Sequence, residues 1–246
     1  MKKLFVALVT LSGLAVSGGV YAAFADAPKD EAGQGQLEIS GTLTNTNPVW
    51  VWGIPSDVKM AAADITLQKI TGVVEGSNTA FALDSMNNIV LLEGYMKTPA
   101  PSGGAGLRPV ITVGSQQVTE VCWTEQEACN IEVDALNSNT KVGVLQLKVD
   151  AELASAYLGH ESKPTTRGTD KTLAALTALP FFQTTYPNPI SATGTNENTY
   201  TSLSWTNTQN VSSYMMVNSN SAKLIVPTSS VPDVWSATLP ITVTQK

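Results

Sequence analysis

The sequence predicts an all-β protein, a β-sandwich that carries a small helical insertion. Many short segments alternate apolar and polar residues and are separated by turn residues, which is typical of strands. Only two segments have the residue spacing of a helix. After residue 184 the chain becomes rich in Thr, Asn and Ser, a composition that suits strands better than helices. These observations together favour two packed sheets.

The first residues are typical of a secretory signal peptide. Lys2 and Lys3 precede a short apolar stretch from Leu4 to Val16, and small residues then lead to a cleavage site at Ala22, or as late as Ala25. An uncleaved membrane anchor is the alternative, but the stretch is short and interrupted by Gly and Ser. We expect a signal peptide over 1–22, an N-terminal extension over 23–44 and one domain over 45–246.

The predicted strands and helices follow in order along the remaining chain. The first strand, residues 37–44, places Leu37, Ile39, Gly41 and Leu43 on one face. The two predicted helices cover 150–158, which is rich in Ala, and 169–179, where Leu recurs every third residue before a Pro. They define a helical insertion at about 150–185. The other predicted strands cover 49–52, 64–70, 89–92, 109–113, 117–123, 141–149, 200–205, 213–217 and 223–226.

The last predicted strand has the longest alternation in the chain. A period of two places five apolar side chains on one face, namely Trp235, Ala237, Leu239, Ile241 and Val243. Pro240 removes one backbone donor from this strand. A chain that ends on such a strand either closes a sheet internally or receives a strand from another molecule. The second possibility would make the protein a polymer subunit.

The two cysteines, Cys122 and Cys129, are close in sequence and follow the predicted signal. In an oxidising compartment this spacing predicts a disulfide, whose short loop contributes roughly 2–3 kcal/mol on the chain-entropy model. A zinc site is not predicted, because the chain has a single histidine, His160, and no other thiol. A redox pair is not predicted either, because the spacing is not C-x-x-C.

Charge and motif content exclude several functions. The chain has 14 basic and 20 acidic residues, a net charge of −6, and without Lys2 and Lys3 the balance is 12 against 20, or −8. Nucleic acids and anionic membranes require clustered Lys and Arg, so neither is an expected partner. The sequence has no P-loop, dinucleotide or zinc-protease motif. An enzyme would depend on His160, which lies in a polar loop, so we predict neither catalysis nor a cofactor or metal.

The chain resembles the chaperone–usher fimbrial subunits, in particular the FaeG/ClpG type, in which the major subunit is itself the adhesin. Three stretches carry the resemblance: 36–52, with its Gly-containing strand and Trp50-Val51-Trp52; 140–158; and the alternating strand from Trp235 onward. The resemblance implies an immunoglobulin-like sandwich that lacks its last strand. A periplasmic chaperone fills the gap first, and the N-terminal extension of the next subunit then replaces the chaperone strand.

Residue roles follow from this resemblance. It implies Leu37, Ile39, Gly41 and Leu43 as the donor strand, and Trp235, Ala237, Leu239, Ile241 and Val243 as one edge of the acceptor groove. It also implies that basic residues of the chaperone anchor the carboxylate of Lys246. The family usually has an aromatic residue at the penultimate position, where this chain has Gln245.

We therefore expect a structural subunit of an adhesive fimbria, exported through the periplasm to the bacterial surface. Its expected partners are copies of itself or sister pilins, the chaperone, the outer-membrane usher and a host glycan receptor. Tyr157, Phe181 and Phe182 near the insertion are candidate receptor contacts, with core packing as the other interpretation. The alternative function is a secreted, monomeric, carbohydrate-binding β-sandwich module.

Overall fold

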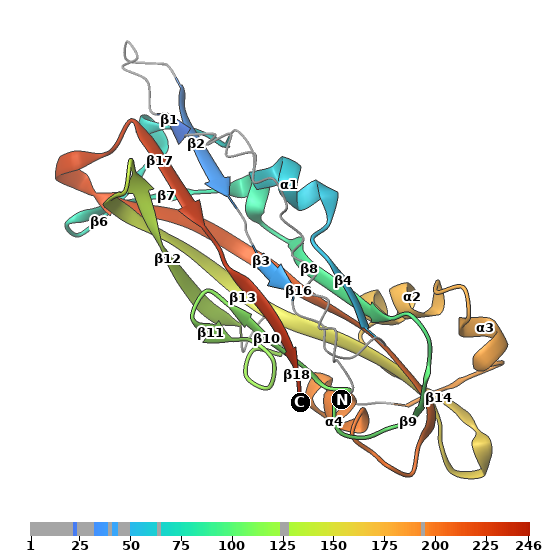
Figure 1. Cartoon of the computed structure of the whole chain (residues 1–246). Helices are drawn as coiled ribbons and strands as arrows, with labels where there is room; N and C mark the ends of the chain where they lie inside the picture. Colours follow the sequence, from blue (N-terminus) through green and yellow to red (C-terminus); the bar gives the residue numbers. More distant parts are fainter. Residues whose placement is uncertain are drawn as a thin grey trace, which may run out of the picture.

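The computed structural model describes residues 22–23, 32–38, 41–43, 50–62, 65–123, 128–192 and 195–246. It has a larger and a smaller β-sheet, and two long strands, β13 and β16, run along most of the molecule (Figure 1). The predicted class, all-β with a small helical part, is confirmed.

The larger sheet has the strand order β4-β8-β16-β13-β12-β17-β2-β5. These strands are β4 (Trp50–Gly53), β8 (Ile89–Met96), β16 (Gln209–Pro227), β13 (Thr140–Leu158), β12 (Cys129–Asn137), β17 (Val234–Thr238), β2 (Ala32–Glu38) and β5 (Ile65–Gln68). Short strands extend it: β1 (Ala22–Ala23) beside β17, β6 (Val73–Glu75) beside β7 (Asn78–Ala82), β9 (Ala100–Ser102), β14 (Pro164–Gly168) and β15 (Ile190–Ser191).

The smaller sheet has the order β11-β10-β18-β3 and packs against the larger one. Its strands are β11 (Gln116–Gln117), β10 (Pro109–Val113), β18 (Ile241–Gln245) and β3 (Gly41–Leu43). Ile111 and Val113 of β10 are fully buried, in the same apolar core as Leu145 and Leu147 of β13. The core between the sheets therefore consists of the inward-facing residues, which alternate with outward-facing ones along each strand, as the predicted sandwich requires.

In the part of the chain that the structure describes, four α-helices and several 3-10 turns accompany the sheets. The α-helices are α1 (Ser56–Ala62), α2 (Asp170–Thr177), α3 (Phe182–Thr185) and α4 (Asn196–Ser202). The 3-10 turns are η1 (Lys69–Thr71), η2 (Asp84–Met86), η4 (His160–Ser162) and η5 (Thr228–Ser230). The predicted helix over 169–179 is confirmed as α2, which Thr169 caps by accepting a hydrogen bond from the Thr172 N–H.

The helix predicted over 150–158 is wrong, because these residues form the second half of β13. There β13 has strand partners on both edges, β16 and β14, which satisfy its backbone groups. Its outer face is covered as well, since Ala154 and Ala156 are fully buried in a second apolar cluster with Leu176 and Phe182. Small side chains fit under the helices, and this packing overrides the helix propensity of Ala.

The strand predicted over 200–205 is also wrong, because α4 covers Asn196–Ser202. Thr195 caps this helix by accepting a hydrogen bond from the Asn198 N–H. The Tyr200 side chain then reaches into the core, where its hydroxyl donates to the carbonyl of Pro109 at 3.0 Å. The Thr-, Asn- and Ser-rich composition predicts a strand here, whereas residues 200–202 form the last part of a capped helix.

The predicted disulfide between Cys122 and Cys129 is confirmed. It joins the segment after β11 to the first residue of β12, and Cys122 is fully buried. Within the described residues, no helix is both long enough and apolar enough to cross a membrane.

Trp50 and Trp52 lie on one face of β4, and their rings stack at a centroid distance of 4.9 Å. Trp52 lies directly over Gly94 of β8, its strand partner. A Cβ atom at Gly94 would come within 2.1 Å of the Trp52 ring, whereas a Cβ atom at Gly53 would meet nothing within 4 Å. The Trp pair therefore depends on a glycine in the neighbouring strand.

We expect Gly94→Ala to displace Trp52 and to lower the free energy of unfolding by about 1–3 kcal/mol, as overpacking does. Thermal unfolding followed by Trp fluorescence measures both the loss of stability and the disturbed ring pair. Gly53→Ala is the matched control and should leave the midpoint nearly unchanged. Equal midpoints for the two variants would refute the close packing of Trp52 on β8.

A buried polar network lies on the helical side of β13. Glu152 accepts hydrogen bonds from Asn218 at 2.8 Å and from the Thr169 hydroxyl at 2.5 Å. Asp150, two residues earlier, is only 4% exposed. Burial, together with the charge of Glu152, raises the pKa of Asp150 above its ordinary value of 3.8, and hydrogen bonds from the neighbouring asparagines and the charge of Lys171 offset only part of this effect.

The pH dependence of stability should reveal this carboxyl group. Because its pKa is raised on folding, the protonated form contributes stability at low pH, and this contribution is lost as the pH rises through the folded-state pKa. Asp150→Asn should therefore raise the unfolding midpoint at neutral pH, with a difference from wild type that shrinks toward about pH 3. Asp134→Asn, which removes an exposed carboxylate, is the control. A midpoint for Asp150→Asn below wild type at neutral pH would contradict the prediction.

Candidate functional site: the outer edge of the closing strand

The closing segment of the chain passes from one sheet to the other. Its first part, β17, pairs antiparallel with β12 in the larger sheet, and its second part, β18, pairs antiparallel with β10 in the smaller sheet. Leu239 and Pro240 lie between the two strands. The missing N–H of Pro240 therefore falls at the switch between sheets, and its carbonyl accepts a hydrogen bond from the Gly114 N–H at 2.8 Å.

The predicted alternation of the closing segment is confirmed across this switch. The five apolar residues expose at most 2% of their surface: Trp235, Ala237, Leu239, Ile241 and Val243. The residues between them are half-buried or exposed, such as Ser236 and Thr242. One continuous apolar face thus contributes to the core of both sheets.

The other edge of the closing segment pairs with the N-terminal part of the same chain. Residues 36–38 of β2 run parallel to residues 236–238 of β17, so that Leu37 lies opposite Ala237. Residues 41–43 of β3 run parallel to residues 241–243 of β18, so that Gly41 lies opposite Ile241 and Leu43 opposite Val243. The register is the same in both pairs. The remaining predicted donor residue, Ile39, lies outside the described residues.

The first strand of the domain and the last residue of the chain lie at the same end of the molecule. The indole N–H of Trp50 donates to the carbonyl of Leu107 at 3.0 Å. On either side of Leu107, the Gly106 N–H donates to the carbonyl of Lys246 at 2.8 Å, and the Lys246 N–H donates to the carbonyl of Arg108 at 2.9 Å. We call this the Trp50 end. The closing segment starts at the opposite end, which we call the β17-start end.

The Trp50 end is held together by charged and aromatic contacts. Glu120 forms ion pairs with Lys246 at 3.1 Å and with Arg108 at 3.7 Å. The Arg108 guanidinium lies 5.4 Å from the ring centre of Tyr200. Burial raises the pKa of the Tyr200 hydroxyl to about 12, so it remains a hydrogen-bond donor to Pro109 at neutral pH. The C-terminal part of the edge is thereby fixed to β10 and α4.

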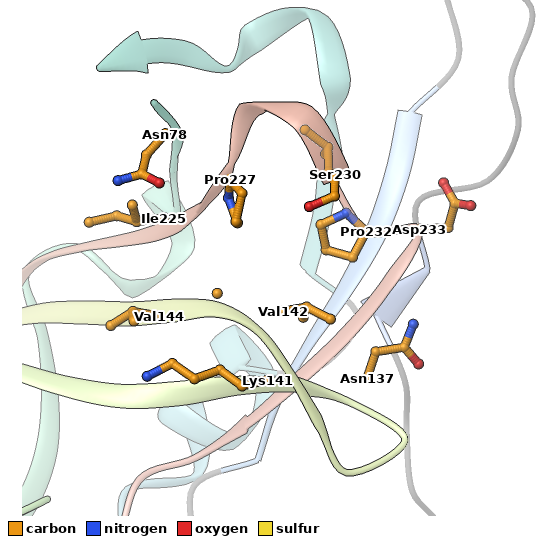
Figure 2. A pocket seen from close by; sticks show the side chains of 12 residues that line it. Asn78, Asn137, Lys141, Val142, Val144, Ile225, Pro227, Ser230, Pro232 and Asp233 are labelled. Atoms are coloured by element: carbon orange, nitrogen blue, oxygen red, sulfur yellow. The ribbon is translucent and has the colours of Figure 1, made fainter. Parts of the chain in front are cut away.

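A groove of about 620 Å³ opens at the β17-start end, between the β12–β13 hairpin and the connection from β16 to β17. Figure 2 shows Asn78, Pro227 and Ser230 on one side of the opening and Lys141 and Val142 on the other. The apolar part of its wall comes from Val142, Val144, Ile225, Pro227, Val231 and Pro232. Asp233, on its rim, forms an ion pair with Lys69 of η1 at 2.6 Å.

The three candidate receptor contacts differ in exposure. Phe182 is fully buried beneath α2, and Tyr157 is 5% exposed. The Tyr157 hydroxyl accepts a hydrogen bond from Arg167 at 2.9 Å, and its ring meets the edge of Trp205 at 5.9 Å. Phe181 is half-buried. Their role in receptor binding stays a prediction, and of the three only Phe181 presents appreciable surface.

The residues that the structure describes contain no group of three His, Cys, Asp or Glu side chains that could hold a metal ion. The backbone of His160 lies in η4, and its side chain lies outside the described part.

The structure is a β-sandwich in which an N-terminal segment pairs with the outer edge of the closing segment. The family model described as "Fimbrial, major and minor subunit", of the K88 type, matches residues 1–182 of the 246. The chain belongs to this family, and the predicted relationship to FaeG-type fimbrial subunits is confirmed. A search of curated proteins finds no match. Two of the three stretches that carried the resemblance, 36–52 and 140–158, lie inside the matched region.

Membership of the family defines the general role. Its members are structural and are not known as enzymes. Membership implies export through the periplasm, assembly with other subunits, a chaperone and an usher, and a final place in a surface fimbria.

We expect Leu239→Ala to destabilise the protein strongly, because Leu239 is fully buried where the closing segment changes sheets. Truncating a buried Leu costs about 2–5 kcal/mol. Thr242→Ala, three residues later at an exposed position of β18, should cost little. Chemical denaturation of both variants measures the difference. Similar unfolding midpoints would show that the switch between sheets is not part of the core.

Proposed function

We propose that the protein is a structural subunit of an adhesive fimbria and polymerises by donor-strand complementation. Leu37, Ile39, Gly41 and Leu43 of one subunit would occupy the groove beside the closing segment of the next subunit. The observation that carries the proposal is the pairing of β2 and β3 along the outer edge of β17 and β18. The edge is compatible with this N-terminal sequence in a continuous register.

The energetics of strand addition agree with the proposal. Without a strand on that edge, the backbone N–H and C=O groups of β17 and β18 would lack partners beside a buried apolar face. Burial of the three large donor side chains, Leu37, Ile39 and Leu43, contributes roughly 5–9 kcal/mol. The cost of ordering the donor segment, roughly 1–2 kcal/mol per residue, offsets much of this gain. A donor strand would then hold mainly because its release is slow.

The parallel direction within one chain follows from where the domain begins. Residues 44–49 connect Leu43 to Trp50, and a fully extended connection of that length spans at most about 25 Å. Trp50 lies beside Lys246, at the end where β18 finishes. Leu43 must therefore stay near that end. The short connection thus favours a parallel pairing of β3 with β18.

A fibre requires the opposite direction. If a donor strand ran parallel to the closing segment of another subunit, the donor's body would lie at the acceptor's Trp50 end. The two Trp50 ends would then face each other, which closes a two-fold dimer by reciprocal exchange. If the donor strand runs antiparallel, the donor's body lies at the acceptor's β17-start end. The edge of the donor's own closing segment then remains accessible to a further subunit, and the fibre grows in one direction.

Adhesion belongs to the same proposal and is assigned to the helical part of the molecule. The half-buried Trp205 carries the Arg167 guanidinium 5.4 Å from its ring centre, beside Tyr157. Half-exposed aromatic rings are suited to the apolar faces of sugars. Phe181 and Trp205 are therefore two separate candidate side chains for binding a host glycan, because they pack against different apolar clusters.

Removal of residues 26–44 tests the donor strand. We expect the exported variant to bind its chaperone and to form no fibres by electron microscopy, because the acceptor edge remains and the donor is gone. A peptide of residues 32–44 should then stabilise the released subunit when added separately.

Deletion of residues 26–31 alone is the matched control, since it leaves β2 and β3 intact, and it should still give fibres. The donor-strand proposal fails if the longer deletion folds as a stable soluble monomer without a chaperone.

A further inference from the structure

The β17-start end has an exposed apolar surface that strand exchange itself does not use. Ile70 of η1 is 76% exposed, and Val73 and Val74 of β6 are 61% and 63% exposed. These three lie within five positions, whereas the other large apolar side chains exposed in the described residues lie apart in sequence, at Val51, Met60, Val121 and Ile190. Val73 and Val74 are neighbours in β6 and therefore point to opposite faces, so both faces of this strand present an exposed apolar side chain. Single exposed apolar residues are ordinary, but several close together mark interaction sites.

This apolar surface adjoins the groove at the same end. In the β6–β7 pair, Glu75 lies opposite Asn78, which lines the groove, and Val73 shares the face of Glu75. Val74 lies opposite Thr79 on the other face. The Thr79 hydroxyl is 3.0 Å from that of Thr228, and Lys69 of η1 holds Asp233 on the rim. Among the described residues β6 pairs only with β7, so its other edge has no strand partner. We call Ile70, Val73, Val74 and the groove the β6 surface.

The occupant of this surface follows from chain length and therefore rests on the proposed strand exchange. An antiparallel donor strand ends with Leu43 near the start of the acceptor's β17. The donor's Trp50 can then lie no more than about 25 Å away, because residues 44–49 must connect the two. The connection therefore holds the donor's folded domain next to the surface around the acceptor's β17-start end. The β6 surface is the apolar part of that region.

We propose that the β6 surface is the second contact between successive subunits and receives the Trp50 end of the donor's body. The partner is a second copy of this chain or a sister subunit with the same fold. The contact is heterologous, because different surfaces of the two copies meet, and it therefore repeats along a fibre. Val51, which is 38% exposed at the Trp50 end, is an apolar residue available to meet it.

The test uses the chaperone-bound full chain in a reconstituted assembly reaction. The double variant Val73→Asp/Val74→Asp places two charges on the β6 surface. We expect subunits to add to fibres about ten-fold more slowly, while chaperone binding and the unfolding midpoint stay as in wild type. Ile190→Asp, at an exposed apolar position away from this end, is the matched control and should assemble at the wild-type rate.

Cross-linking gives a readout that does not depend on the charged variant folding. Subunits with Val74→Cys and subunits with Val51→Cys are co-assembled and treated with a short bismaleimide. A dimer that contains one subunit of each kind supports the contact, and fibres that form without this product overturn it. Wild-type assembly rates for Val73→Asp/Val74→Asp, or equal slowing by Ile190→Asp, also overturn it.

The two proposals fail in different ways. If the wild-type chain forms no fibres, both fall together. If fibres form and the variant with residues 26–44 deleted forms none, strand exchange stands, and the β6 surface is judged by its own variants and by the cross-link.

Discussion

The outer edge of the closing segment, which needs a strand partner, is the constraint on which the rest of the structure depends. On one side β12 and β10 satisfy the backbone of β17 and β18, and their shared face is buried in the core. The opposite side carries the remaining N–H and C=O groups of an apolar segment, which need strand partners. In the isolated chain the N-terminal residues supply them, with Leu37 opposite Ala237 and Leu43 opposite Val243. The direction of that pairing is set by the position of Trp50 beside Lys246.

The sequence predicted well what depends on side-chain period. The alternation from Trp235 to Val243 and the pairing of Cys122 with Cys129 needed only local spacing and the redox compartment. The sequence could not predict that the closing segment changes sheets at Pro240, because burial alternates with a period of two on both sides of the switch. Nor could it predict a parallel N-terminal partner, since one period serves both strand directions.

Both errors arise where a neighbouring element decides the local structure. Residues 150–158 were predicted as helical from their alanines, yet β16 and β14 pair with both edges and α2 covers one face. The side chains of these residues are small because α2 packs closely against the strand, and not because the segment is helical. The sequence predicts a strand over 200–205, although α4, which Thr195 caps, extends through Ser202. In both places the decisive information is which element lies alongside, and no single segment carries it.

In the proposed strand exchange, the same N-terminal residues would serve the closed monomer and the growing fibre, and this competition would explain the need for a chaperone. Reversal of a strand keeps a period of two, so Leu37, Gly41 and Leu43 can present one face to the groove in either direction. A donor in the same chain has an effective concentration of about millimolar, far above that of a free neighbour. A subunit left alone would therefore close on itself. In the proposed assembly, a chaperone strand that occupies the edge first would exclude the parallel form. The antiparallel donor of the neighbouring subunit would then replace the chaperone strand and not the subunit's own extension.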